Sequence, residues 1–193
     1  MRIASTALAL TLVCGTLQGC VPLVVGGAAA GVAVAHDRRT SSAVVQDQLI
    51  ETAIYDRIAK DKDFTDESHI SVTSYNQVVL LTGEVPTREL GLRVAQFARE
   101  HEKVRQVHNE LVISAPSSLA SRSNDALITT AAKSSLLGVD VEGFDPTRVK
   151  IITEAGTVYL MGLVTATEAE RATDQIRRTQ GVRKVVRLFE IIQ

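Results

Sequence analysis

The side chains best suited to covalent chemistry are two cysteine thiols, and both lie near the start of the chain. Cys14 and Cys20 are the only cysteines among the 193 residues. A thiolate acts as a nucleophile and as a metal ligand, so these positions define where thiol chemistry can occur. Because no cysteine follows Cys20, the rest of the chain cannot form an internal disulfide bond or a thiolate metal site.

The histidines lack the spacing of a metal or catalytic site. None of the four, His36, His69, His101 and His108, belongs to an H-E-x-x-H motif. The chain also lacks a G-x-S-x-G nucleophile motif and a G-x-x-x-x-G-K-[ST] phosphate-binding loop. The sequence therefore predicts a protein that is not an enzyme and that binds no metal or other cofactor apart from covalent lipid.

Residues 1–19 have the layout of a lipoprotein signal peptide. Arg2 gives a positive start, and residues 3–17 carry no charge, which is typical of a secretory signal. The segment ends in Leu17-Gln18-Gly19-Cys20, which resembles a bacterial lipobox. This resemblance implies cleavage before Cys20, a diacylglyceryl group on its sulfur and a fatty acid such as palmitate on the new amino terminus.

A transmembrane helix is an alternative interpretation of the same region, because residues 3–35 are uncharged. Pro22, Gly26 and Gly31 interrupt its second half and favour the lipobox. Several acyl chains give stable anchoring, and residues 20–45 then form a lipidated Gly/Ala-rich tether. Val21, where inner-membrane lipoproteins of this kind usually carry Asp, implies sorting to the outer membrane.

Composition and charge exclude several classes of protein. The chain has 22 acidic and 21 basic residues, so it lacks the basic excess typical of nucleic-acid binders. Aromatic residues make up 4% and tryptophan is absent, which argues against a stacking surface for bases or sugars. A hydrophobic content of 45% argues against a mostly disordered chain. We expect a folded protein with no nucleic-acid partner.

The rest of the chain contains one unit twice. Residues 70–85 (ISVTSYNQVVLLTGEV) align with residues 149–164 (VKIITEAGTVYLMGLV), 79 positions later. Two further pairs align at an offset of 78, residues 47–59 with 125–137 and residues 103–113 with 181–191. The Ser-rich stretch between the copies is typical of a linker. We therefore predict domains at residues 46–113 and 124–193, joined by a linker at 114–123.

Each unit is predicted as helix, strand, strand, helix and strand. In the second unit, Asn124 or Asp125 is expected to cap the helix at residues 125–137, whose core face carries Ile128, Ala132 and Leu136. Further helices are expected at residues 87–100 and 167–179, the latter with a capping box of Thr167 and Glu170. Last strands are expected at residues 105–113 and 183–192.

Four glycines are expected to have structural roles. Gly156, like Asn76 in the first unit, tolerates the positive φ of a hairpin turn. Gly83 and Gly162 occupy equivalent places within strands, where glycine marks a bulge or a close backbone approach. Gly181 precedes the last strand of the second unit, where the first unit has Lys103.

These motifs resemble the BON domain. The second unit carries its V-x-L-x-G-x-V hairpin at residues 158–164 and its G-V-x-x-V turn at residues 181–185, whereas the first unit has Lys in place of the turn glycine. The resemblance implies an α+β fold of two tandem BON domains, each a three-stranded mixed sheet packed on two helices.

A lipobox followed by two such units is similar to the dual BON-domain outer-membrane lipoproteins, as is the SNDxxITT stretch at residues 123–130. The resemblance implies a lipid-anchored factor that faces the periplasm and supports envelope integrity, possible enrichment at division sites, and a second domain that binds anionic phospholipid through its first helix.

On that helix, Leu127 and Leu137 lie away from the predicted core face, and Lys133 could reach a lipid phosphate. A second interpretation packs Leu127 on the linker and Leu137 on the following loop. Residues 47–113 hold 12 acidic and 8 basic side chains, and residues 124–192 hold 9 of each. The second unit therefore meets less repulsion at an anionic surface.

Protein partners give an alternative function. The exposed edges of two small sheets suit strand pairing or helix docking with an outer-membrane assembly protein. A soluble stress chaperone is disfavoured by the lipobox. The sequence does not indicate how the two units pack.

Overall fold

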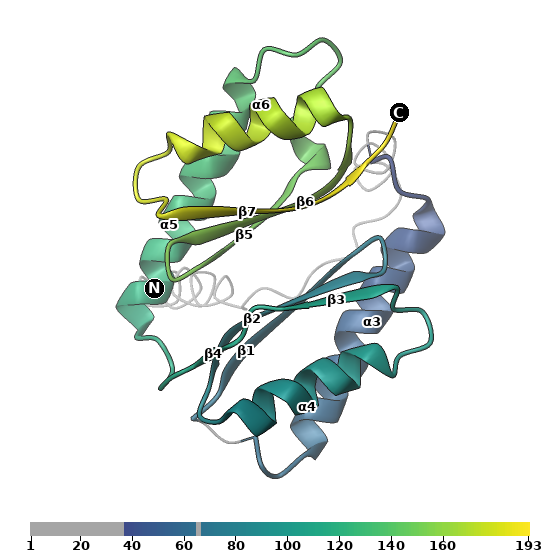
Figure 1. Cartoon of the computed structure of the whole chain (residues 1–193), viewed down its shortest axis with the longest axis vertical. Coiled ribbons are helices and arrows are strands. Elements are labelled where there is room, and N and C mark those ends of the chain that lie inside the picture. Colours follow the sequence, from purple (N-terminus) through teal and green to yellow (C-terminus); the bar gives the residue numbers. More distant parts are fainter. Residues whose placement is uncertain (1–36, 65–66) are drawn as a thin grey trace, which may run out of the picture. The chain divides into compact units, whose positions relative to one another are not determined.

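The computed structural model describes residues 37–64 and 67–193. Cys20, the predicted signal peptide and most of the predicted tether lie outside the described residues. The described chain forms two domains, and Figure 1 shows each as a sheet with two helices on one face.

The first domain consists of α3 (Ser41–Lys60), β1 (His69–Tyr75), β2 (Val78–Val85), α4 (Arg88–Arg99), β3 (Gln106–Asn109) and β4 (Val112–Ile113). Strand β2 lies at the centre of the sheet, antiparallel to β1 and parallel to β3 and β4. The predicted last strand at residues 105–113 is interrupted between β3 and β4, where Leu111 packs against the core and Asn109 Oδ1 accepts a hydrogen bond from its N–H.

The second domain consists of α5 (Leu119–Ser135), η1 (Leu136–Gly138), η2 (Pro146–Arg148), β5 (Lys150–Glu154), β6 (Thr157–Val164), α6 (Ala166–Arg177) and β7 (Lys184–Ile191). Its sheet has the order β5-β6-β7, with β5 antiparallel and β7 parallel to the central β6. The predicted α+β fold and the predicted order of elements are confirmed in both domains.

Each domain has its own hydrophobic core between its sheet and its helices. In the second domain Ile128, Leu160 and Ile176 from α5, β6 and α6 are buried together. In the first domain the core contains Ile50 of α3 and Val94 of α4. Apolar residues recur on one face of each helix, so burying that face against the sheet is the main favourable contribution to folding.

A third cluster joins the two sheets through their other faces. Tyr75, Val78 and Leu80 of the first domain pack with Tyr159 and Met161 of the second. All eight residues of β2 are buried, because one face meets the helices and the other meets the second sheet. A continuous apolar strand of this kind is typical of a strand covered on both sides.

The hairpin turns have the predicted positive φ angles. Asn76 and Gln77 have φ of 50° and 65°, and Ala155 and Gly156 have φ of 47° and 72°. Two consecutive positive values are those of a type I′ turn, whose twist matches the flanking strands.

The strand glycines lie where the backbone of another segment approaches closely. A Cβ at Gly83, whose φ is +109°, would lie 2.0 Å from the carbonyl oxygen of His69. A Cβ at Gly162 would lie 2.6 Å from the carbonyl oxygen of Arg148. Gly181 has a φ of +88°, and a Cβ there would lie 2.8 Å from Ile128.

The predicted start of the second domain's first helix is wrong. Helix α5 begins at Leu119, inside the predicted linker, and Ser118 caps it by accepting a hydrogen bond from the Ser121 N–H. Asp125 is buried in the helix and accepts hydrogen bonds from the hairpin turn instead.

The predicted capping box is also misplaced by two residues. The reciprocal bonds join Thr165 and Glu168. Strand β6 ends at Val164, so the helix must begin at once to bring Ala169 into the core.

The end of the predicted tether is part of the folded structure. Helix α3 starts at Ser41, and two arginines before it contact both domains. Arg38 forms an ion pair of 2.6 Å with Glu168 in the second domain, and Arg39 forms one of 2.8 Å with Asp47 in the first. Residues 37–45 therefore do not belong to a free tether.

Candidate functional site

The outward face of α5 is the strongest candidate for a binding surface. The helix buries Ile128, Ala132 and then Leu136 of η1 against the sheet. Residues at this spacing occupy one side of a helix, so the opposite side faces solvent.

Three leucines on this opposite side are largely exposed. Leu119 is 75% exposed, Leu127 is 70% exposed and Leu137, in η1, is 78% exposed. At about 100° per residue their directions fall within about 80° of one another, and at 1.5 Å per residue they span about 27 Å. We call these three residues the leucine row. The interpretation that Leu127 and Leu137 pack on the linker and the following loop is wrong, because both side chains are in solvent.

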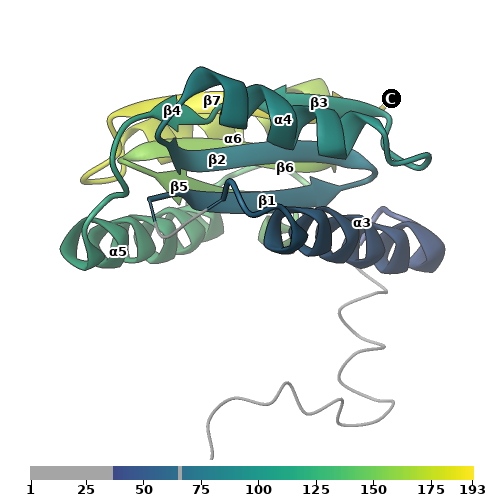
Figure 2. The ribbon, with the colours of Figure 1, turned by 90° about the horizontal axis from the view of Figure 1, so that it is seen from below.

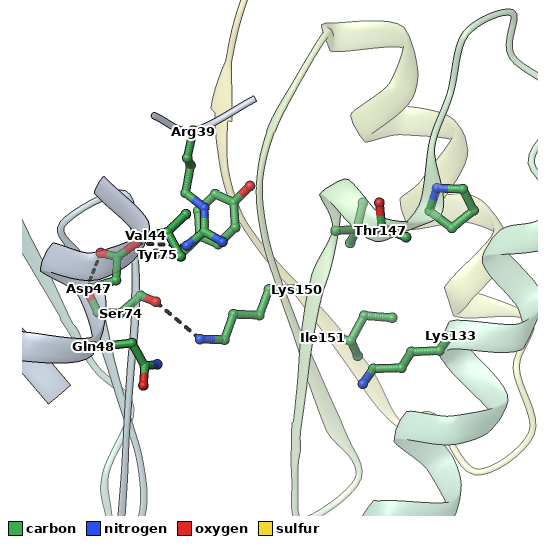
Figure 3. A pocket seen from close by; sticks show the side chains of 12 residues that line it. Arg39, Val44, Asp47, Gln48, Ser74, Tyr75, Lys133, Thr147, Lys150 and Ile151 are labelled. Carbon is green, nitrogen blue, oxygen red and sulfur yellow. Dashed lines mark hydrogen bonds and ion pairs between the residues drawn. The ribbon is translucent and has the colours of Figure 1, made fainter. Parts of the chain in front are cut away.

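Lys133 lies beside the leucine row and also lines a groove between the domains. The groove has a cavity volume of about 520 Å³, with Val44 and Gln48 of α3 on one wall and Lys133 and Ile151 on the other. Figure 3 shows Lys133 and Lys150 pointing into it from the second domain. No hydrogen bond or ion pair of Lys133 occurs within the described part of the chain, so its ammonium group is available for an anion.

The other cations of the groove are paired. Lys150 lies 3.3 Å from the Glu51 carboxylate and donates to the carbonyl oxygen of Ser74. Arg39 stacks on Tyr75 with its guanidinium carbon 4.0 Å from the ring centroid. Burial is the largest single influence and opposes its charge, but the hydrogen bonds and charge of Asp37, with smaller contributions from Tyr75 and Asp47, together outweigh it and raise the pKa of Arg39. Among the described residues that line the groove, Lys133 is thus the one cation without a partner.

Helices α3 and α5 flank this groove and lie on the same side of the molecule (Figure 2). Helix α3 also exposes apolar side chains, since Val45 and Leu49 are both more than half exposed. Both helices that flank the groove therefore expose apolar side chains.

The first domain has a separate exposed apolar patch. It consists of Leu92 on α4 and Ile113 on β4, which are 51% and 58% exposed. Leu92 and Ile113 line a cavity of about 260 Å³. Exposed apolar patches mark contact sites for proteins, ligands or membranes, so this patch is a second candidate binding surface.

Sequence reasoning missed Leu119 because the Ser-rich composition assigned it to a linker. It also missed the shared role of Asp47 and Asp125. Asp47 accepts hydrogen bonds from the N–H groups of Asn76 and Gln77, as Asp125 does from those of Ala155 and Gly156. The signal was present in the repeat, where both copies begin their aligned helix with Asp.

None of the helices within residues 37–64 and 67–193 is long and apolar enough to cross a membrane.

Comparison with known proteins agrees with this architecture. The BON domain family matches residues 46–115 and 124–193. The chain belongs to the BON domain family. The outer membrane lipoprotein DolP of Haemophilus influenzae is 37% identical over 177 residues, which cover 91% of this chain and 90% of that protein.

A second relative is the 21 kDa hemolysin of Actinobacillus pleuropneumoniae, which is 33% identical over 158 residues, or 81% of this chain and 80% of that protein. Among solved structures, CdsD, a structural protein of the type III secretion system of Chlamydia trachomatis, matches with a TM-score of 0.30 and 13% identity. That match covers 77% of this chain and 92% of CdsD and supports no functional argument.

Proposed function

We propose that this BON protein is a non-enzymatic outer-membrane lipoprotein that supports envelope integrity. The lipobox at Cys20 and the relative named as an outer membrane lipoprotein support an acylated anchor, with the two domains facing the periplasm. In this proposal the second BON domain binds anionic phospholipid in the inner leaflet, at division sites among other places.

The leucine row is the observation that carries the lipid-binding part of the proposal. Leu119, Leu127 and Leu137 have no partner surface within the described residues that covers them, and each is at least 70% exposed. Leucine side chains on one face of a surface helix insert into the boundary between headgroups and acyl chains, and each contributes about 1.5–3 kcal/mol when fully buried.

Lys133 gives the surface its preference for anionic lipid. Its unpaired ammonium group lies on the flank of the leucine row, where it can meet a phosphate. A lysine near an anionic membrane surface contributes about 1 kcal/mol. Because the helix carries no tryptophan or tyrosine, we expect reversible binding that depends on the acyl anchor for residence.

Flotation on liposomes tests this proposal. The unit Ala35–Gln193 is compact, contains both cores and lacks the lipid anchor. It is expected to float with vesicles of phosphatidylethanolamine and phosphatidylglycerol and not with neutral vesicles. Leu127→Glu and Leu137→Glu are each expected to reduce binding about tenfold, because a charge replaces an inserted leucine.

Leu92→Glu is the matched control, since Leu92 is also an exposed leucine on a helix but lies in the first domain. It should float like the unmodified unit. Equal loss in all three variants, or no flotation at low salt, would contradict lipid binding by α5.

A protein-interaction adaptor is the second candidate, and the apolar patch of Leu92 and Ile113 favours it. Under this alternative, Leu92→Glu abolishes co-purification of an outer-membrane assembly protein from crosslinked cells, whereas Leu137→Glu does not.

A further inference from the structure

Three side chains able to bind a metal meet where the two sheets pack together. His69 begins β1, Glu84 lies near the end of β2 and Glu154 ends β5. One ligand atom from each lies within 4.8 Å of the other two. Two of the residues belong to the first BON domain and the third to the second.

The register of the strands brings these residues together. His69 and Glu84 are directly opposite each other in the antiparallel pair β1–β2, so both side chains point to the same face of that sheet. In β5, Ile152 packs on the cluster between the sheets, and side chains two residues apart share a face. Glu154 therefore points toward the first domain, as His69 and Glu84 point toward the second.

The Glu84 carboxylate is buried and the Glu154 carboxylate is half-buried, and few contacts compensate their charges. The Glu84 side chain is 8% exposed, and its Oε2 lies 3.1 Å from Nδ1 of His69. The Glu154 carboxylate has no hydrogen-bond or ion-pair partner among residues 37–64 and 67–193. Burial, and then the charge of Glu84, raise the pKa of Glu154.

The surroundings contribute charges of both signs and access to solvent. Asp125 and Arg122 also lie near Glu154. The Asp125 carboxylate is already bonded to two backbone N–H groups, so it contributes charge and not a ligand. A cavity of about 260 Å³ lined by His69, Arg122 and Glu154 leaves room for water.

We propose that His69, Glu84 and Glu154 bind one Zn²⁺ ion, which links the two BON domains. An imidazole nitrogen with two carboxylate oxygens is a donor set that suits zinc and not calcium or magnesium, which prefer oxygen ligands alone. Ligand bonds of about 2.0–2.1 Å in a tetrahedral site place neighbouring donors about 3.3 Å apart, close to the 3.1 Å between His69 and Glu84.

The ion would fill its fourth position with water from the cavity. It would also neutralise the two carboxylates at the sheet contact. Zinc binding would therefore stabilise the packed arrangement of the domains. This inference is independent of lipid binding by α5.

Zinc titration tests the proposal. Untagged Ala35–Gln193, which contains no cysteine, is stripped with chelator and titrated with ZnCl₂ at neutral pH by isothermal calorimetry. We expect one ion per chain and a melting temperature that rises by about 3 °C or more at saturating zinc. The mature lipoprotein in detergent should give the same stoichiometry.

Glu154→Gln and His69→Ala are expected to weaken zinc binding at least tenfold. Glu154→Gln removes a charge that its surroundings disfavour, so this variant should fold at least as stably as the unmodified protein. Its loss of zinc would then report the loss of a ligand.

His101→Ala and Glu142→Gln are controls of the same residue types outside the cluster and should retain full affinity. Binding in the absence of Glu154 and His69, no heat of binding in the unmodified protein, or equal affinity for Mg²⁺ would each overturn the proposal.

Discussion

The buried carboxylate of Asp125 accepts a hydrogen bond of 2.8 Å from the N–H group of Gly156, in the turn of the β5–β6 hairpin. A second bond of 2.9 Å joins it to the N–H of Ala155. Turn residues with positive φ direct their N–H groups away from the strand ladder, so these donors need another partner. Asp125 supplies that partner and fixes the first helix of the domain to its hairpin.

We predict that Asp125→Ala destabilises the protein by roughly 2–4 kcal/mol, because two N–H groups lose a charged acceptor in a buried position. Urea unfolding of Ala35–Gln193 followed by circular dichroism measures this. Asp140→Ala, an exposed aspartate in a loop, serves as control and should stay within about 0.5 kcal/mol of the unmodified protein. A similar small effect at Asp125 would show that water replaces the carboxylate.

Much of this fold could be predicted from the repeat and the periodicity. The spacing of apolar residues predicted the order of helices and strands, and Asn76 and Gly156 predicted the positions of the two hairpin turns. The start of α5 could not be predicted, because Ser118 and the Ser-rich segment after it are equally typical of a linker and of a helix cap. The position of the second capping box was ambiguous because Thr165 and Thr167 both precede a glutamate by three residues.

The candidate sites differ in how far the sequence could predict them. Leu127 and Leu137 follow from helical spacing, since Leu137 falls opposite Ile128 and Leu127 falls opposite Leu136. The contact of His69 and Glu84 with Glu154 depends on how the two sheets pack, and no spacing within one chain segment indicates that arrangement. Arg38 was predicted as part of a tether because its partner, Glu168, lies 130 residues away.

The close approach at Gly83 gives a second prediction. Gly83→Ala must place a Cβ against the carbonyl oxygen of His69 and keep a φ of +109°. We therefore expect this variant to lower the free energy of unfolding by roughly 3 kcal/mol or more. Gly143 also has a positive φ, of +74°, but nothing lies within 4 Å of its Cβ position.

Gly143→Ala is therefore the matched control. It should lower the free energy of unfolding by only about 1 kcal/mol, because alanine is strained at a positive φ but meets no neighbouring atom there. Thermal unfolding of both variants measures the difference. Equal losses would mean that backbone strain, and not the contact with His69, determines the need for glycine at position 83.

The ion pair of Arg38 with Glu168 predicts a dependence of stability on pH. Burial alone would favour the neutral acid, but hydrogen bonds from Arg38 and Thr165 outweigh it and lower the pKa of Glu168. A carboxyl group with a lowered pKa contributes stability above its unfolded-state value of 4.5, and this contribution is lost as the pH falls through the lower folded-state value.

Arg38→Ala leaves the buried Glu168 carboxylate without its bidentate partner. We expect this variant to lower the free energy of unfolding by roughly 1–3 kcal/mol at pH 7. The loss should shrink as the pH falls below 4.5. Chemical unfolding from pH 7 to pH 3 measures both effects, with Arg99→Ala, an exposed arginine, as control. A loss that stays constant with pH would contradict the assigned role of the ion pair.

Lys133 should determine how strongly the second domain prefers anionic lipid. Lys133→Gln is expected to weaken binding to vesicles containing phosphatidylglycerol by about 1 kcal/mol, or about fivefold, and to leave binding to neutral vesicles unchanged. Lys62→Gln, an exposed lysine after α3, is the control. The preference should also fall with added salt, since charges at a solvent-exposed membrane surface are screened beyond about 8 Å at physiological ionic strength.

The half-buried charge of Glu154 predicts the opposite pH behaviour to that of Glu168. Because its pKa is raised above the usual 4.5, Glu154 stabilises the fold most when it is protonated, and this contribution is lost as the pH rises through the folded-state pKa. In the presence of chelator, Glu154→Gln should therefore raise the melting temperature at pH 7 and leave it nearly unchanged at pH 4. Differential scanning calorimetry at both pH values measures this, with Glu142→Gln as control. A lower melting temperature at pH 7 would show that Glu154 is already paired in the metal-free protein.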